Sequence, residues 1–190
     1  MTENYYEEEI FQNLNQPNDD FTNKEFEQCS FENCDFSVSD FSYTSFSQCS
    51  FTNCNLSMAK LNDTSLKGVE FKNCKLSGLN FSDCNDFIFE VSFSECILDF
   101  TIFTKVSMKK TNITGCHIHE ANFIETNLEM AVFDNCDFLN TTFERANLGR
   151  CDFATSYNYI INPNNNFIKR ARFSIDGLPG LLASYDIVVD

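Results

Sequence analysis

The sequence predicts an all-β solenoid in which every coil has four short sides. Apolar residues fall at every fifth position from Phe21 to Phe81 and, after a slip of two residues, from Ile88 to Phe153. Most of the 22 phenylalanines occupy these positions, called centres below. A longer period of twenty relates similar tetrapeptides: FENC at 31, FTNC at 51, FKNC at 71 and FDNC at 133. Four five-residue units therefore close one coil, because like residues return after twenty positions.

Each five-residue unit supplies one side of a coil. The residue two positions before a centre is usually Cys, Ser, Thr or Ala, and residues two apart on an extended segment point to the same side. Both side chains are expected to point inward, so the three residues between one centre and the next small residue must turn a corner. Asn and Gly, which tolerate positive φ, are common at the second of them. Seven coils at the parallel-strand spacing give a rod of roughly 30–35 Å.

The pattern [small]-[Asp/Asn]-[Leu/Phe]-x-x, repeated from about 19 to 156, resembles that of the pentapeptide-repeat proteins. The resemblance covers nearly three-quarters of the chain and implies a right-handed quadrilateral β-helix. Several bacterial members, including the fluoroquinolone-resistance proteins, bind DNA gyrase or topoisomerase IV as DNA mimics. They are usually dimers joined through their C-termini, and many other members have no established activity.

The two ends of the chain depart from the repeat, so we divide it into three parts. Residues 1–18 are expected to form a short N-terminal cap, with a helical turn in NYYEEEIF, although Phe11 lies twenty residues before Phe31. Residues 19–156 form the solenoid, with a two-residue slip near 83–87. Residues 157–190 are expected to form an irregular last coil and then a C-terminal cap with a short helix in IDGLPGLLASY.

Two groups of apolar residues are candidates for an interface. The C-terminal group either seals the last coil or pairs with a second subunit, and it consists of Leu178, Leu181, Leu182, Tyr185, Ile187 and Val189. The second group follows the slip and is expected to point outward. It either forms an interaction patch or is covered by the insertion itself. Its members are Phe87, Phe89, Ile97, Phe100 and Ile102, with Ile124, Val132 and Leu139 further along.

The cysteines and histidines favour a structural interpretation over a metal site. All ten cysteines occupy the small inward position, and no Cys-x-x-Cys pair occurs. We expect ten reduced, buried thiols, which suits a cytoplasmic protein. His117 and His119 flank the inward Ile118 and are expected to be solvated. No cofactor or metal is predicted, although a thiol ladder that binds metal is a weaker hypothesis.

The net charge of −15 limits the classes of partner. It disfavours nucleic acid and anionic membranes and favours basic protein surfaces. Residues 1–40 carry eleven acids and one base. Further along, the outward columns mix signs, as in Glu32, Thr52, Lys72, Ser94, Thr114 and Asp134, which counts against a simple DNA mimic.

The sequence contains no nucleophile–base set or phosphate-binding glycine loop, so we do not expect an enzyme. The preferred hypothesis is a protein-binding or scaffold rod with an acidic surface and an unidentified partner. The alternative, taken from the resemblance, is a regulator that binds a type II topoisomerase and protects it from quinolones. The oligomeric state is expected to be a monomer or a C-terminal homodimer.

Overall fold

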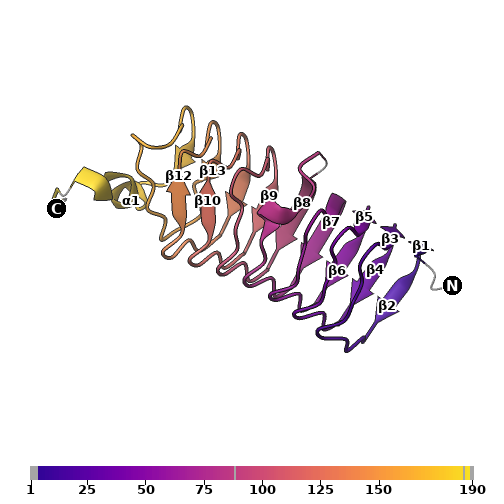
Figure 1. Cartoon of the computed structure of the whole chain (residues 1–190). Coiled ribbons are helices and arrows are strands. Elements are labelled where there is room, and N and C mark those ends of the chain that lie inside the picture. Colours follow the sequence, from indigo (N-terminus) through magenta and orange to yellow (C-terminus); the bar gives the residue numbers. More distant parts are fainter. Residues whose placement is uncertain (1–3, 88, 186, 189–190) are drawn as a thin grey trace.

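A computed structural model describes residues 4–87, 89–185 and 187–188 of the chain. The chain winds into a β-solenoid of about eight turns, with its two ends at opposite ends of a rod (Figure 1). The described residues include fourteen short strands and one α-helix. The strands are β1 Tyr5–Glu7, β2 Ile10–Gln12, β3 Glu25–Glu27, β4 Ser30–Glu32, β5 Ser45–Ser47, β6 Ser50–Thr52, β7 Ser65–Lys72, β8 Phe89–Ser94, β9 Asn112–Thr114, β10 Asn122–Ile124, β11 Val132–Asp134, β12 Thr142–Glu144, β13 Asp152–Phe153 and β14 Arg172–Phe173, and the helix is α1 Leu178–Leu182.

The register of the strands follows the twenty-residue period. Phe31 pairs with Phe51 between β4 and β6, and Val132 pairs with Asp152 between β11 and β13. All strand pairs are parallel. Across the slip the step is 22, since Phe71 pairs with Phe93. The predicted four-sided solenoid is confirmed, with about eight turns rather than seven.

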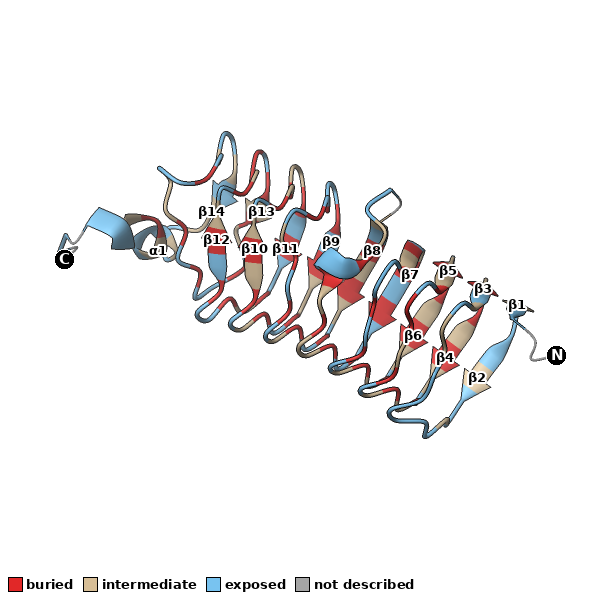
Figure 2. Ribbon diagram, in the orientation of Figure 1, coloured by how far each residue is buried: buried red, intermediate tan, exposed pale blue. Residues whose placement is uncertain are grey.

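The interior is a set of stacked side chains. The rings of Phe31 and Phe51 stack with centroids 4.5 Å apart and planes 7° apart, whereas Phe46 and Phe51, on adjacent sides of one coil, meet edge to face at 69°. Figure 2 shows the buried residues recurring along each side of the coil. Burying one such ring contributes about 1.5–3 kcal/mol, so the repeated centres supply most of the driving force for the fold.

The corners repeat one strained conformation. The second residue after a centre has positive φ, for example 63° at Val38 and 60° at Phe100. For residues other than glycine this conformation costs about 1–2 kcal/mol. Each corner amide is fixed by the next coil, as when Val38 N donates to Ser57 O at 2.9 Å. The stacking of coils therefore imposes the conformation even on a β-branched side chain.

The insertion changes the register at one corner only. Residues Phe81–Asp83 form a single 3₁₀ turn that Asn80 caps by accepting from Ser82 N. Leu66 then pairs with Phe89, and the register shifts further along the strand, between Lys67 and Val69. Phe89 is half-buried and packs on the core, so its predicted outward orientation is wrong. Ile88, the centre expected from the sequence, lies outside the described residues.

The N-terminal segment is a further coil of the solenoid. β1 pairs with β3 and β2 with β4, in the same twenty-residue register as the later coils. The expected helical turn over NYYEEEIF is therefore wrong. The next coil offers backbone partners at the right spacing, and Tyr6 and Phe11 stack on Phe26 and Phe31 at 5.0 Å each. These interactions override the irregular sequence.

The C-terminal end is closed by an irregular coil and α1, as expected. Tyr159 is buried and packs on Phe153 and Phe173. α1 lies close against this coil, because a Cβ at Gly180 would come 2.0 Å from Tyr159 O, and Ile161 N donates to Gly180 O. Leu181 is the α1 residue buried at this contact.

Candidate interaction surfaces

The cysteines form a buried ladder inside the solenoid. All ten thiols are buried and unbridged, as predicted. Eight of them, all but Cys84 and Cys116, donate from Sγ to a carbonyl of the preceding coil, as Cys49 does to Phe26 O at 3.4 Å. Desolvation raises the pKa of Cys49 to about 11, which keeps this thiol protonated. No group of three metal-ligating side chains occurs in the described part of the chain.

The two histidines differ in their surroundings. His117 is exposed, as predicted. His119 is half-buried, and its Nε2 lies 2.9 Å from Asp137 Oδ2, without the alignment of a hydrogen bond. Its backbone amide donates to Asp99 Oδ1. His119 is therefore attached to the neighbouring coil rather than freely solvated, and the prediction was wrong for it.

The structure separates the apolar residues expected to cluster after the slip. Phe87 is 90% exposed on the insertion, whereas Phe89 packs edge to face on Phe81 at 5.9 Å. Phe100 is 56% exposed but lies at another corner of the coil. A single patch of these three residues is therefore not formed.

Phe100 instead belongs to an apolar column that the sequence analysis missed. Val38, Met58, Gly78 and Phe100 occupy the same positive-φ corner in four consecutive coils; we call this column the corner ridge. Val38 and Met58 are 50% and 62% exposed. Met58 lies over Gly78, because a Cβ there would be 2.3 Å from its Sδ. The signal was present in the sequence, since these residues follow one another at steps of 20, 20 and 22.

The C-terminal residues divide into one that seals the coil and several that face outward. Leu181 is buried and Leu182 half-buried, whereas Leu178, Tyr185 and Ile187 are exposed. Asn164 Nδ2 donates to the Tyr185 hydroxyl at 3.0 Å. Val189 lies outside the described residues. Leu181 is thus placed to cap the last coil, and the exposed Leu178, Tyr185 and Ile187 are placed to contact a second subunit.

Some charges on the solenoid stack with their opposites. Lys60 Nζ lies 3.2 Å from Asp40 Oδ2, and Lys109 Nζ lies 3.1 Å from Glu129 Oε2. In both pairs the partners are one coil apart. Exposed pairs of this kind contribute about 0–1 kcal/mol, but they cancel charge locally. At these positions the acidic surface of the rod is interrupted.

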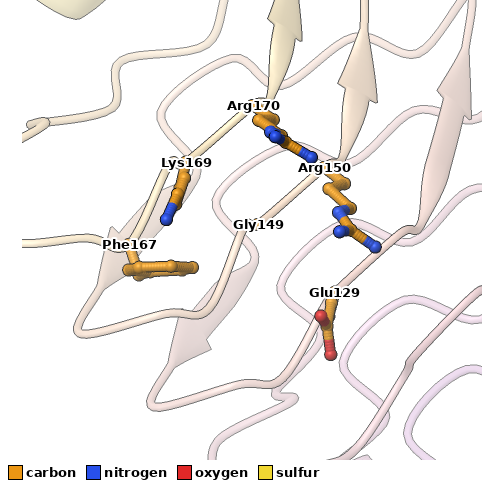
Figure 3. Close-up of a pocket in the computed structure, with 6 residues that line it drawn as sticks. All are labelled: Glu129, Gly149, Arg150, Phe167, Lys169 and Arg170. Carbon is orange, nitrogen blue, oxygen red and sulfur yellow. The ribbon is translucent and has the colours of Figure 1, made fainter.

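A groove lined by three basic side chains lies near the C-terminal end. It encloses about 380 Å³ and is lined by Glu129, Gly149, Arg150, Phe167, Lys169 and Arg170 (Figure 3). The Phe167 ring lies against Gly149, where a Cβ would be 2.9 Å from it. Among the described residues, Arg150, Lys169 and Arg170 form no ion pair. The C-terminal end is thus locally basic, in contrast to the acidic N-terminal end.

Comparison with known proteins identifies the repeat. A model described as a pentapeptide repeat region matches residues 24–85, and one described as pentapeptide repeats matches residues 109–152. Together they cover more than half of the chain. No curated protein sequence matches it. None of the described helices is long and apolar enough to cross a membrane.

Solved structures agree with this fold. A trypsin-treated form of QnrB1, a plasmid-mediated fluoroquinolone resistance protein, aligns over 98% of both chains with a TM-score of 0.72 and 19% identity. Full-length QnrB1 aligns over 94% of this chain and 100% of its own, with a TM-score of 0.61 and 20% identity. HetL, a pentapeptide repeat protein from the cyanobacterium Nostoc, aligns over 93% of both chains with a TM-score of 0.48 and 13% identity. At these identities the likeness concerns the fold alone.

Proposed function

Because the chain belongs to the pentapeptide-repeat proteins, we propose that it is a non-enzymatic rod that binds a protein partner through the corner ridge. The family is generally non-catalytic. The observation that carries the proposal is the exposure of Val38, Met58 and Phe100 at one corner of the solenoid, with Gly78 in the coil between Met58 and Phe100. A contiguous exposed apolar surface of this kind usually marks an interface.

The solenoid makes this surface well suited to binding. The ridge residues are held by corner amides that donate to the next coil, as Met58 N does to Ser77 O and Phe100 N to His119 O. The backbone under the ridge is therefore already ordered before a partner arrives, which lowers the entropy cost of association. Ile97 and Ile102 lie on the same coil as Phe100 and extend the apolar area.

Charge substitutions on the ridge test the proposal. Met58→Glu with Phe100→Glu should abolish specific capture of the partner from a lysate of the source cells, measured by quantitative mass spectrometry. Val132→Glu with Leu139→Glu is the matched control, because both residues are also exposed. These substitutions should leave capture unchanged. Equal capture by wild-type protein and the ridge variant would contradict the proposal.

A second candidate function is regulation of a type II topoisomerase with protection from quinolones. The alignment with QnrB1 over 98% of both chains supports it, whereas the stacked opposite charges weigh against a DNA-mimicking surface. A gyrase supercoiling assay with a fluoroquinolone tests it. Protein at micromolar concentration should restore supercoiling under this hypothesis, and no change would remove it.

We also propose a cytoplasmic location and a C-terminal segment that leaves the chain monomeric or joins two copies. Ten unbridged buried thiols support a reducing compartment. The exposed Leu178, Tyr185 and Ile187 support pairing, and the buried Leu181 supports capping. Light scattering on the intact chain and on a chain ending at Phe173 separates these cases. A dimer only in the intact chain assigns the segment to pairing.

A further inference from the structure

Three basic side chains line the groove near the C-terminal end, and they come from adjacent coils (Figure 3). Arg150 and Arg170 occupy the same positive-φ corner one coil apart, and Arg150 N donates to Lys169 O at 2.9 Å. All three side chains are exposed. Among the described residues they form no ion pair. Like charges held this close repel one another, so an anion between them is favoured.

The carboxylate in the lining of the groove does not neutralise these cations. Glu129 is the one acidic residue among the described residues that line it. The Glu129 Oε2 atom lies 3.1 Å from Lys109 Nζ, one coil earlier. Glu129 is therefore already paired with a cation outside the lining, and the groove keeps an excess of positive charge. This excess contrasts with the net charge of −15 on the whole chain.

An aromatic ring lies in the same groove on a fixed backbone. Phe167 is 57% exposed, and its ring lies against Gly149, where a Cβ would be 2.9 Å from it. The preceding residue, Asn166, is buried, and its side chain donates to Phe143 O and accepts from Ala146 N, both at 3.0 Å. Phe167 N also donates to Ala146 O. The backbone that carries the ring is therefore ordered before a ligand arrives, which lowers the entropy cost of binding.

The size and chemistry of the groove together indicate the class of ligand. Its volume of about 380 Å³ lies within the range of roughly 300–1,000 Å³ that is typical of small-molecule sites. Guanidinium groups bind phosphate oxygens in a bidentate geometry, and an exposed aromatic ring stacks on the planar ring of a base. A purely acidic ligand would use the cations and leave the ring uncovered. The combination favours a planar ring that carries phosphate.

We propose that the groove binds a nucleoside phosphate. The base stacks on the Phe167 ring, and the phosphate groups lie among Arg150, Lys169 and Arg170. This site goes beyond the protein-binding function proposed above and shares no residue with the corner ridge. The Met58→Glu, Phe100→Glu variant should therefore bind nucleotide like the wild type, so failure of one proposal leaves the other standing.

Isothermal titration calorimetry of the full chain at low ionic strength tests the proposal with three probes. Adenosine diphosphate should show saturable binding to one site. Adenosine lacks the phosphates and pyrophosphate lacks the base, so each should bind at least about tenfold more weakly than the diphosphate. Added salt should weaken the binding of adenosine diphosphate and of pyrophosphate, because it screens the exposed cations.

Variants of the protein assign the two halves of the ligand to their residues. Arg150→Ala with Arg170→Ala should lower the affinity for adenosine diphosphate and for pyrophosphate at least about tenfold. Phe167→Leu should lower the affinity for adenosine diphosphate about tenfold and leave that for pyrophosphate unchanged. Lys105→Ala with Arg145→Ala is the matched control, because it removes two exposed cations that lie beside Glu125 and outside the groove.

The control variant should bind adenosine diphosphate like the wild type, and thermal unfolding verifies that each variant is folded before binding is measured. Absence of binding, or an affinity that the Arg150→Ala, Arg170→Ala variant leaves unchanged, would overturn the proposal. Pyrophosphate that binds as tightly as adenosine diphosphate would also overturn it, because the ring would then contribute nothing. A glutamate-rich peptide that binds as tightly would assign the groove to a protein partner and would contradict the proposal as well.

Discussion

The small inward position of each repeat requires a hydrogen-bond donor as well as a small side chain. Thr126 Oγ1 donates to Phe103 O at 2.7 Å, and Ser156 Oγ donates to Phe133 O at 2.9 Å. Cys49 Sγ makes the equivalent contact with Phe26 O. In each case the acceptor is 23 residues earlier, on the preceding coil. This position therefore favours a side chain that is small and carries a hydrogen-bond donor, which explains why Cys, Ser and Thr recur.

Substitution of Thr126 tests this requirement. Thr126→Val keeps the shape but removes the donor, and we expect it to lower the free energy of unfolding by about 1 kcal/mol. Thr126→Cys keeps a donor and should cost less. Urea unfolding of the three proteins measures the difference. A valine variant as stable as the wild type would show that size alone governs this position.

A second residue-level feature is the hydrogen bond between Asp40 and Ser42. The Ser42 hydroxyl donates to Asp40 Oδ1, and this hydrogen bond is the main reason that the pKa of Asp40 lies below its ordinary value. Burial acts in the opposite direction and raises the pKa. A hydrogen bond from the Ser42 amide lowers the pKa further. Because the folded pKa is lowered, the carboxylate stabilises the fold above the unfolded pKa of about 3.9. This contribution is lost as the pH falls through the folded value.

Ser42→Ala should therefore raise the pKa of Asp40 toward its ordinary value and reduce the loss of stability in acid. Carboxyl carbon NMR titration measures the pKa directly. Asp35 is an internal control, because its pKa is lowered chiefly by the Ser37 amide. An unchanged Asp40 titration would contradict the assigned cause.

At the scale of elements, α1 and the last coil depend on each other. α1 spans five residues, too few to be stable alone in water, so contact with Tyr159 and the last coil must hold it. Leu181 is 9% exposed at this contact, whereas Leu178 is 46% exposed on the same helix. We therefore expect that α1 covers the last coil chiefly through the Leu181 side chain.

Leu181→Asp should lower the free energy of unfolding by about 2 kcal/mol or more, because it places a charge in a buried contact. Leu178→Asp should change it by less than about 0.5 kcal/mol. Urea unfolding at two protein concentrations checks both values. Equal effects of the two substitutions, or a dependence on concentration, would favour a C-terminal subunit contact over capping.

The sequence predicted the solenoid interior well, because every coil needs an apolar residue at each centre and a small residue two positions before it. It predicted the two ends and the insertion less completely. At the insertion Ile88 and Phe89 are both apolar, so periodicity could not decide between them. The first coil was missed because Glu9 and Asp19 replace the small inward residues, although the next coil still supplies its backbone partners. The corner ridge could have been found only by comparing outward-facing residues twenty positions apart. The fold does not fix the polarity of these residues, so the repeat pattern did not indicate the ridge.

The whole molecule is a rod with unlike ends. The interior coils are paired on both sides, the C-terminal coil is covered by α1, and the N-terminal coil is paired on one side within the described residues. The N-terminal end is also acidic, while Arg150, Lys169 and Arg170 lie near the C-terminal end. The two ends of the described rod therefore differ in strand pairing and in charge.

Hydrogen exchange of the isolated chain, followed by mass spectrometry, tests this asymmetry most directly. Slow exchange should extend from β3 to the last coil over Tyr159 and Ile161, while Tyr5–Gln12 exchanges fastest among the strands, because within the described residues β1 and β2 pair with one neighbouring coil and the interior strands with two. Protection of Tyr5–Gln12 equal to that of the interior coils, or rapid exchange across the middle of the rod, would contradict the account.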